Sequence, residues 1–134
     1  NVDSSAIDKV REEFNSRPGK LPEQEKFTEP EATKPKSIIE KRKTEDSYMV
    51  LGYKVPPRSS KESYAIDIIR AFLGGGMSSR LFEEIRIKRG LSYGVSAQHD
   101  SNKSFGTFAI TLNAHKNKKA IIKDIILKEI KNLK

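Results

Sequence analysis

The first periodic run of apolar side chains lies near the N-terminus. Residues 5–8 resemble a capping box, and the apolar positions at helical spacing are Ile7, Val10 and Phe14. We therefore expect a short helix that ends near Asn15. Residues 17–36 are rich in Pro and Glu and show little periodicity, which predicts an extended connection or arm inside the domain.

Three later stretches also have helical periodicity. A helix that begins near Ser59 or Ser60 should end at glycines 74–76, and its predicted buried stripe is Ala65, Ile68, Ile69, Phe72 and Leu73. The next helix should be capped by Ser78 or Ser79, and its apolar positions are Met77, Leu81, Phe82 and Ile85. The last helix should direct toward the core Ile122, Ile125, Ile126, Ile130 and Leu133.

Alternating or continuous apolar residues predict strands in the first half of the chain. Residues 37–42 are one candidate, and residues 47–55 are another. The second candidate carries apolar side chains on both faces, which is typical of an interior strand. It should end at Pro56 and Pro57, because proline has no backbone N–H to donate.

A second pair of strand patterns predicts a hairpin and completes the fold class. Residues 93–97 and 105–112 are joined by a polar turn at 100–103, so an antiparallel hairpin is the simplest connection. The order of elements predicts a single α+β domain over residues 1–134, with an antiparallel sheet packed against helices on one face. A strand apolar on both faces needs cover on each side, so we expect the domain to be partial.

Composition favours a soluble globular chain over a disordered or membrane protein. Of the 134 residues, 33% are charged and 35% are hydrophobic, and the net charge is +8. The basic residues are spread among acidic ones, so we expect a solvated surface and neither nucleic-acid nor membrane partners. No apolar run approaches the roughly 20 residues that span a bilayer, and no secretory pattern is present. We expect a cytoplasmic location.

The chain contains no complete catalytic or metal-binding motif. It has no cysteine, which excludes disulfides, thiolate zinc sites and thiol nucleophiles. Gly74 and Gly76 differ from a dinucleotide fingerprint, because a helix precedes them and Ser79 replaces the third glycine. Neither His99 nor His115 has a partner at zinc-pair spacing, so both are expected to be partly exposed polar residues. The adjacent carboxylates at 83 and 84 should point apart on a helix and be solvated.

Residues 74–97 carry a family resemblance. Their sequence is GGGMSSRLFEEIRIKRGLSYGVSA. This segment resembles the signature of the insulinase/pitrilysin zinc metallopeptidases, as found in members similar to the mitochondrial processing peptidase. The resemblance extends loosely over residues 1–134 and points to the second, non-metal-binding type of domain. It implies a LuxS/processing-peptidase-like sandwich, here as an incomplete copy.

The resemblance also implies a role for two side chains. In that family two homologous α+β domains face each other like a clamshell; the first carries an inverted zinc motif, and the second supplies an Arg and a Tyr seven residues apart. Arg86 and Tyr93 match that pair. They are expected to bind the substrate carbonyl, where zinc-assisted amide hydrolysis builds negative charge. Arg80 is expected to be a structural ion-pair partner, and residues 88–89 are expected to be solvated.

The zinc is expected in a companion domain. The metal ligands and catalytic Glu of that domain are missing from all 134 residues, so we expect no cofactor in this chain and no activity from the chain alone. Two interpretations stay open: a fragment of a zinc metalloendopeptidase that closes the clamshell over its peptide, or a non-catalytic subunit that partners a catalytic chain. The implied partners are a zinc-binding domain, on the same or another chain, and a peptide. The start at Asn1 indicates a piece of a longer protein or a processed chain.

Overall fold

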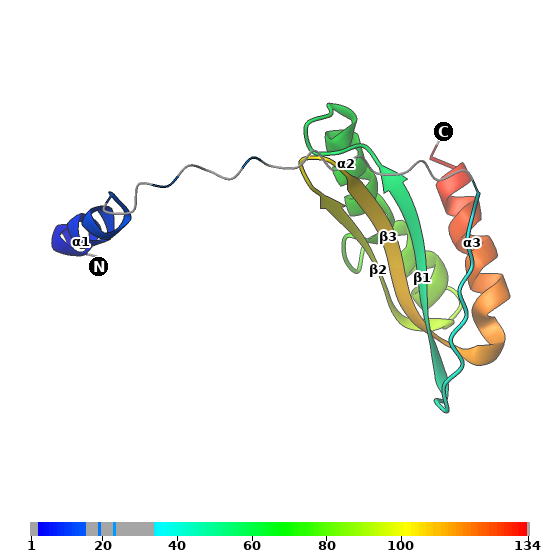
Figure 1. Cartoon of the computed structure of the whole chain (residues 1–134). Coiled ribbons are helices and arrows are strands. Elements are labelled where there is room, and N and C mark those ends of the chain that lie inside the picture. Colours follow the sequence, from blue (N-terminus) through cyan, green and yellow to red (C-terminus); the bar gives the residue numbers. More distant parts are fainter. Residues whose placement is uncertain (1–2, 16–18, 20–22, 24–33, 134) are drawn as a thin grey trace.

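We describe a computed structural model of the chain, which places residues 3–15, 19, 23 and 34–133 (Figure 1). Most of the predicted arm at 17–36 lies outside these residues, and only 19, 23 and 34–36 of it are described. None of the helices among the described residues is both long enough and apolar enough to cross a membrane.

Helix α1 (Ser4–Asn15) forms where the N-terminal pattern predicts it. Its cap is Asp3 rather than the expected box at 5–8, because the Asp3 carboxylate accepts hydrogen bonds from the Ser5 backbone N–H at 3.2 Å and from two serine hydroxyls. The Ser5 N–H is the main cause that lowers the pKa of Asp3. Helix α1 buries no residue, and its apolar positions Ile7, Val10 and Phe14 are all exposed.

Among the described residues the sheet contains three antiparallel strands in the order β1-β3-β2: β1 (Asp46–Val55), β3 (Gly106–His115) and β2 (Ser92–Ser101). The predicted hairpin is confirmed, because β2 and β3 pair along their length. The prediction that 47–55 is an interior strand is wrong, because β3 lies between β1 and β2 in the described sheet. Residues 37–42 form no strand, and Ile38 is 93% exposed.

One face of the sheet is covered by helices, and no other described element covers the opposite face, which is called the open face below. In Figure 1 the helices α2 (Glu62–Gly74) and α3 (Lys119–Lys131) lie behind and beside the strands. Alternate residues of each strand point toward the helices, as the period of a strand requires. The buried core consists of Leu73, Leu81, Phe82, Ile85, Val95, Ala97, Phe108, Ile110, Leu112, Ala114, Ile122 and Ile126. The α+β fold with helices on one face is therefore confirmed.

Helix α2 is rotated relative to the prediction. Of the expected stripe, Leu73 is fully buried and Ile69 partly buried, whereas the exposed members are Ala65, Ile68 and Phe72. Two contacts explain the rotation: Ser63 Oγ lies 3.2 Å from Ser101 Oγ of β2, and Gly74 packs against the backbone of β2. The serine pair and the glycine therefore face the sheet, and part of the apolar stripe is turned to solvent.

Helix α3 follows the expected pattern over most of its length. Its buried side chains include Ile122 and Ile126, and the partly buried positions are Ile125 and Ile130. Leu133 differs from the prediction, because it lies beyond the end of the helix and is exposed.

Gly74 permits the close approach of α2 to β2, which leads to a first prediction. A Cβ at this position would lie 2.4 Å from the backbone nitrogen of Ala97 and 2.8 Å from its Cβ. We expect Gly74→Ala to lower the free energy of unfolding by about 1–3 kcal/mol, because the helix must move away from a closely packed sheet. Urea denaturation measures this difference.

Gly52 provides the matched control on β1. A Cβ there would meet no heavy atom within 4 Å, so Gly52→Ala should change stability by less than about 0.5 kcal/mol. Equal midpoints for the two variants would contradict the close-contact explanation.

Candidate functional site

The helix predicted after the glycines is present but is a π-helix, η1 (Phe82–Ile87). Its wide turn is held by a hydrogen bond of 2.9 Å from the Lys88 N–H to the Glu83 carbonyl. The Ser79 hydroxyl does not cap it but donates to the Gly76 carbonyl at 2.6 Å. Met77, expected in its apolar stripe, is exposed, whereas the other three predicted apolar positions are buried. Short π-helical turns occur frequently at functional sites.

The carboxylates of η1 neutralise the basic residues that follow it. Glu84 lies 2.6 Å from the Lys88 ammonium and 2.5 Å from the Arg89 guanidinium, and Glu83 lies 3.0 Å from the same ammonium. Hydrogen bonding by Lys88, and then by Arg89, lowers the pKa of Glu84 to about 2. The prediction that Glu84 is solvated is wrong, because its side chain is only 17% exposed. Lys88 and Arg89, also predicted to be solvated, are partly exposed and paired with it.

This ion-pair cluster predicts a pH-dependent stability. The pKa of Glu84 is 4.5 when unperturbed and about 2 in the folded chain, so its contribution is complete above pH 4.5 and is lost as the pH falls toward 2. We expect Glu84→Gln to lower the melting temperature at about pH 6. The difference in melting temperature from wild type should narrow as the pH falls from about 4.5 toward 2. Thermal denaturation at a series of pH values measures it.

Glu12→Gln on α1 serves as the control, because Glu12 makes no ion pair with another described residue. Its melting temperature should follow that of the wild type at every pH. A constant gap between Glu84→Gln and wild type from pH 6 to pH 2 would contradict the assignment of the low pKa to Glu84.

Arg80 is confirmed as a structural ion-pair partner. Its Nε lies 2.8 Å from Glu129 of α3, whose side chain is buried. Hydrogen bonding by Glu129 is the main cause that raises the pKa of Arg80. The pair links the start of the π-helical segment to the last helix.

Arg86 differs from the other basic residues of this segment. It makes no ion pair with any residue in the described part of the chain. Its guanidinium lies 4.9 Å from the ring centroid of Phe82, one helical turn earlier, and is exposed to solvent. The apolar pattern predicted Phe82 as a core residue and did not predict its contact with Arg86. The sequence signal for this contact is their i, i+4 spacing, which places two side chains side by side on a helix.

Tyr93 lies at a β-bulge at the start of β2. Ser92 pairs with Ala114 and Val95 pairs with Leu112, so two residues of β2 oppose a single residue of β3. The Ser92 hydroxyl stabilises the bulge: it lies 2.5 Å from the Asn113 carbonyl and accepts the Gly94 N–H at 3.2 Å. Tyr93 is turned outward and is 83% exposed.

A tight turn connects Arg86 to Tyr93. The Gly90 N–H donates to the Arg86 carbonyl at 3.0 Å, and the Leu91 N–H donates to the Ile85 carbonyl at 2.9 Å. Gly90 has a φ of 59°, a left-handed conformation that glycine adopts without steric cost. The turn brings the end of η1 and the start of β2 to the same end of the sheet, and both predicted side chains are solvent-exposed there.

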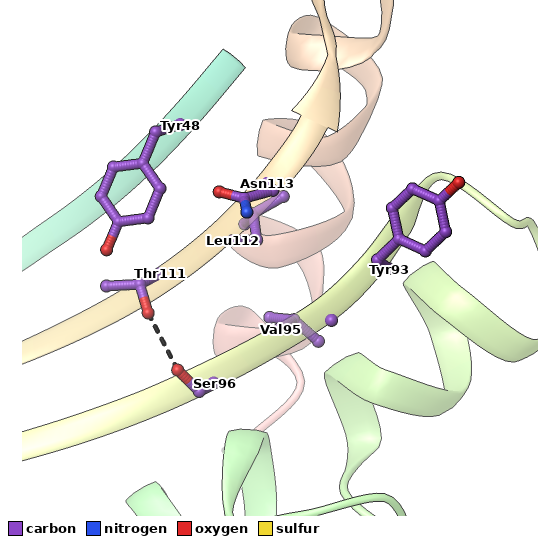
Figure 2. A pocket seen from close by; sticks show the side chains of 8 residues that line it. Tyr48, Tyr93, Val95, Ser96, Thr111, Leu112 and Asn113 are labelled. Carbon is purple, nitrogen blue, oxygen red and sulfur yellow. Dashed lines mark hydrogen bonds between the residues drawn. The ribbon is translucent and has the colours of Figure 1, made fainter. Parts of the chain in front are cut away.

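A shallow hollow of about 320 Å³ lies on the open face of the sheet beside Tyr93 (Figure 2). It is lined by residues from all three strands: Tyr48, Tyr93, Gly94, Val95, Ser96, Thr111, Leu112 and Asn113. In Figure 2 Asn113 lies between the two tyrosines, and the Ser96 and Thr111 hydroxyls are joined by a hydrogen bond of 2.9 Å. The hollow has no signature in the sequence, because its lining residues come from three strands that lie apart in the chain.

The described residues do not fit a zinc site. They contain no group of three or more His, Cys, Asp or Glu side chains that could hold a metal. The side chain of His99 is 1% exposed, so it is buried rather than partly exposed as predicted, and its Nδ1 lies 2.8 Å from Asp67. Arg58 lies 2.6 Å from the same carboxylate and is the main cause that lowers its pKa. These contacts indicate a structural role for His99, and His115 is exposed at the other end of the hairpin.

Proteins of known sequence are similar to this chain. An uncharacterized zinc protease of Mycobacterium leprae is 38% identical over 76 residues, which cover 57% of this chain and 17% of the relative. An uncharacterized zinc protease of Streptomyces coelicolor is 41% identical over 69 residues, which cover 52% of this chain and 15% of the relative. The chain thus spans about a sixth of the length of these curated relatives.

Solved structures share the fold. A protease from Helicobacter pylori matches 98% of this chain and 33% of its own chain with a TM-score of 0.80 and 22% identity. A peptidase M16 inactive domain from Pseudomonas fluorescens matches 66% of this chain and 23% of its own with a TM-score of 0.59 and 26% identity.

The sequence profile of one family matches the chain from end to end. The family is described as the peptidase M16 inactive domain, and the match covers residues 1–134. The resemblance of residues 74–97 to the insulinase/pitrilysin peptidases is therefore confirmed. This chain belongs to the peptidase M16 inactive-domain family, as the non-metal-binding type of domain found in proteins named zinc proteases.

Proposed function

We propose that this domain closes the active site of a zinc peptidase and binds the substrate peptide. In this proposal Arg86 and Tyr93 donate hydrogen bonds to the carbonyl oxygen of the scissile bond. The proteins named zinc proteases among its relatives support the peptidase class. The companion domain, on the same or another chain, holds the zinc, because the described residues offer no site for it.

The observation that carries the proposal is the free guanidinium of Arg86. Its basic neighbours Lys88 and Arg89 are neutralised by carboxylates at 2.5–3.0 Å, whereas Arg86 has no carboxylate partner among the described residues. Its donors are therefore available to an external oxygen. The Phe82 ring, 4.9 Å away, supports the guanidinium without occupying its N–H groups in ion pairs.

The chemistry explains why two such donors matter. Attack on an amide carbon moves negative charge onto the carbonyl oxygen, and donors already in position stabilise that charge more than they stabilise the neutral substrate. A bound zinc polarises the carbonyl or activates water in such enzymes. The residues of this chain bind and orient the oxygen: a guanidinium offers two parallel N–H groups, and a phenol offers one O–H.

Hydrolysis of extended peptides by the full-length protein that carries this domain tests the proposal. Wild type should hydrolyse them, alone or after addition of a separate zinc-binding chain, and variants at Arg86 and Tyr93 should be strongly impaired. If both variants keep kcat/KM within about twofold of wild type, the proposed role is wrong.

A further inference from the structure

Three side chains form a row across the open face of the sheet at the end that carries Tyr93. Tyr48 of β1 pairs with Asn113 of β3, and Asn113 lies opposite the bulge that holds Tyr93. Neighbouring strands are about 4.8 Å apart, so the outer two strands of the row are about 10 Å apart. The side chain of Asn113 lies between the tyrosines (Figure 2), so a ligand side chain would lie over it, with the Asn113 amide as the floor of the hollow.

The lining of the hollow is uncharged. None of its eight residues carries a formal charge, and Ser96 and Thr111 satisfy one another at 2.9 Å. The phenol of Tyr48 and the amide of Asn113 make no hydrogen bond to another described residue, so both can bind a ligand. The nearest charged position on this face of β1 is Asp46, which pairs with His115 at the end of the sheet and does not line the hollow.

We propose that this hollow is a specificity pocket for an uncharged, aromatic or aliphatic side chain of the peptide, on the residue whose carbonyl Tyr93 holds. The inference rests on the proposed function, because Tyr93 serves both as donor and as one wall of the pocket. Neighbouring residues of an extended peptide are about 3.4 Å apart, so the residue at that carbonyl is the one within reach.

The chemistry of the lining selects the class of side chain. Tyr48 is 71% exposed and offers a ring against which an apolar or aromatic side chain can stack. A Lys or Glu side chain would lose hydration in the hollow without gaining an opposite charge. The volume, about 320 Å³, lies at the lower end of small-ligand sites and suits one side chain rather than a larger group.

The test uses the full-length protein and two peptides that differ only in Phe or Lys beside the scissile bond. Tyr48→Ala should lower kcat/KM for the Phe peptide about tenfold and that for the Lys peptide by less than about twofold. Asn113→Asp places a carboxylate in the floor of the pocket and should raise the ratio of Lys to Phe hydrolysis about tenfold. If the protein is catalytically silent, the same ratios apply to the dissociation constants of the two peptides.

Gln98→Asp is the matched control, because Gln98 lies on the open face of β2 outside the hollow and should leave the ratio unchanged. The proposed specificity pocket is wrong if Tyr48→Ala lowers kcat/KM equally for both peptides. It is also wrong if Asn113→Asp leaves the ratio of Lys to Phe hydrolysis unchanged. These outcomes differ from a failure of the proposed function, which would show as full peptide hydrolysis by the Arg86 and Tyr93 variants.

Discussion

Arg86→Ala in the full-length protein is expected to lower kcat for peptide hydrolysis by about 100- to 1,000-fold, the loss typical of one missing transition-state donor. The guanidinium is exposed and without an ion-pair partner among the described residues, so removing it breaks no ion pair and should leave the fold intact. Because the interaction strengthens as charge develops, KM should change much less than kcat. Steady-state kinetics with an extended peptide separate the two parameters.

Two further variants make this prediction specific to the position. Arg86→Lys should restore only a small part of the activity, because an ammonium lacks the planar fork and stacks less well on Phe82. Lys123→Ala removes an exposed positive charge from α3 and should leave kcat within about twofold of wild type. An effect of Lys123→Ala equal to that of Arg86→Ala would indicate general electrostatics and would contradict a donor role.

Tyr93→Phe is expected to lower kcat about 100-fold, because it removes one hydroxyl donor and keeps the ring. Tyr93 is 83% exposed, and its hydroxyl makes no hydrogen bond to another described residue, so stability should be unchanged. Loss of this donor should also weaken a phosphorus-based transition-state analogue more than the substrate. Inhibition constants measured beside kcat test both parts of the expectation.

Tyr64→Phe is the control for the loss of a phenol hydroxyl. Tyr64 is exposed on α2, away from the hollow and the bulge, and its substitution should not change kcat. If Tyr93→Phe weakens the analogue and the substrate to the same extent, the phenol contributes uniform binding and the transition-state role is wrong.

Local pattern predicted the elements whose structure depends on near neighbours. The hairpin of β2 and β3, the end of β1 before Pro56 and the burial of Ile122 and Ile126 all follow from periodicity and turn chemistry. The family segment also singled out Arg86 and Tyr93; both side chains are exposed at one end of the sheet, and their role in binding stays a prediction.

Features that depend on distant contacts were not predictable in this way. In the described part of the chain β1 is an edge strand, because it pairs with β3 on one side and with no described strand on the other, which its apolar content does not reveal. The rotation of α2 depends on Gly74 and Ser63 meeting β2, a contact that its own periodicity does not contain. The hollow brings Tyr48 and Asn113 beside Tyr93 through strand register, which is set only when the sheet forms.

The bulge in β2 also changes how relatives should be compared position by position. Before it the residue facing the helices is Ser92, an even position, and after it the inward residues are the odd ones, beginning with Val95. The phase of the strand therefore inverts within three residues. An alignment that carries one parity through the whole strand would place Tyr93 among core positions, and a homologue that lacks the extra residue would present the matching tyrosine to the opposite side.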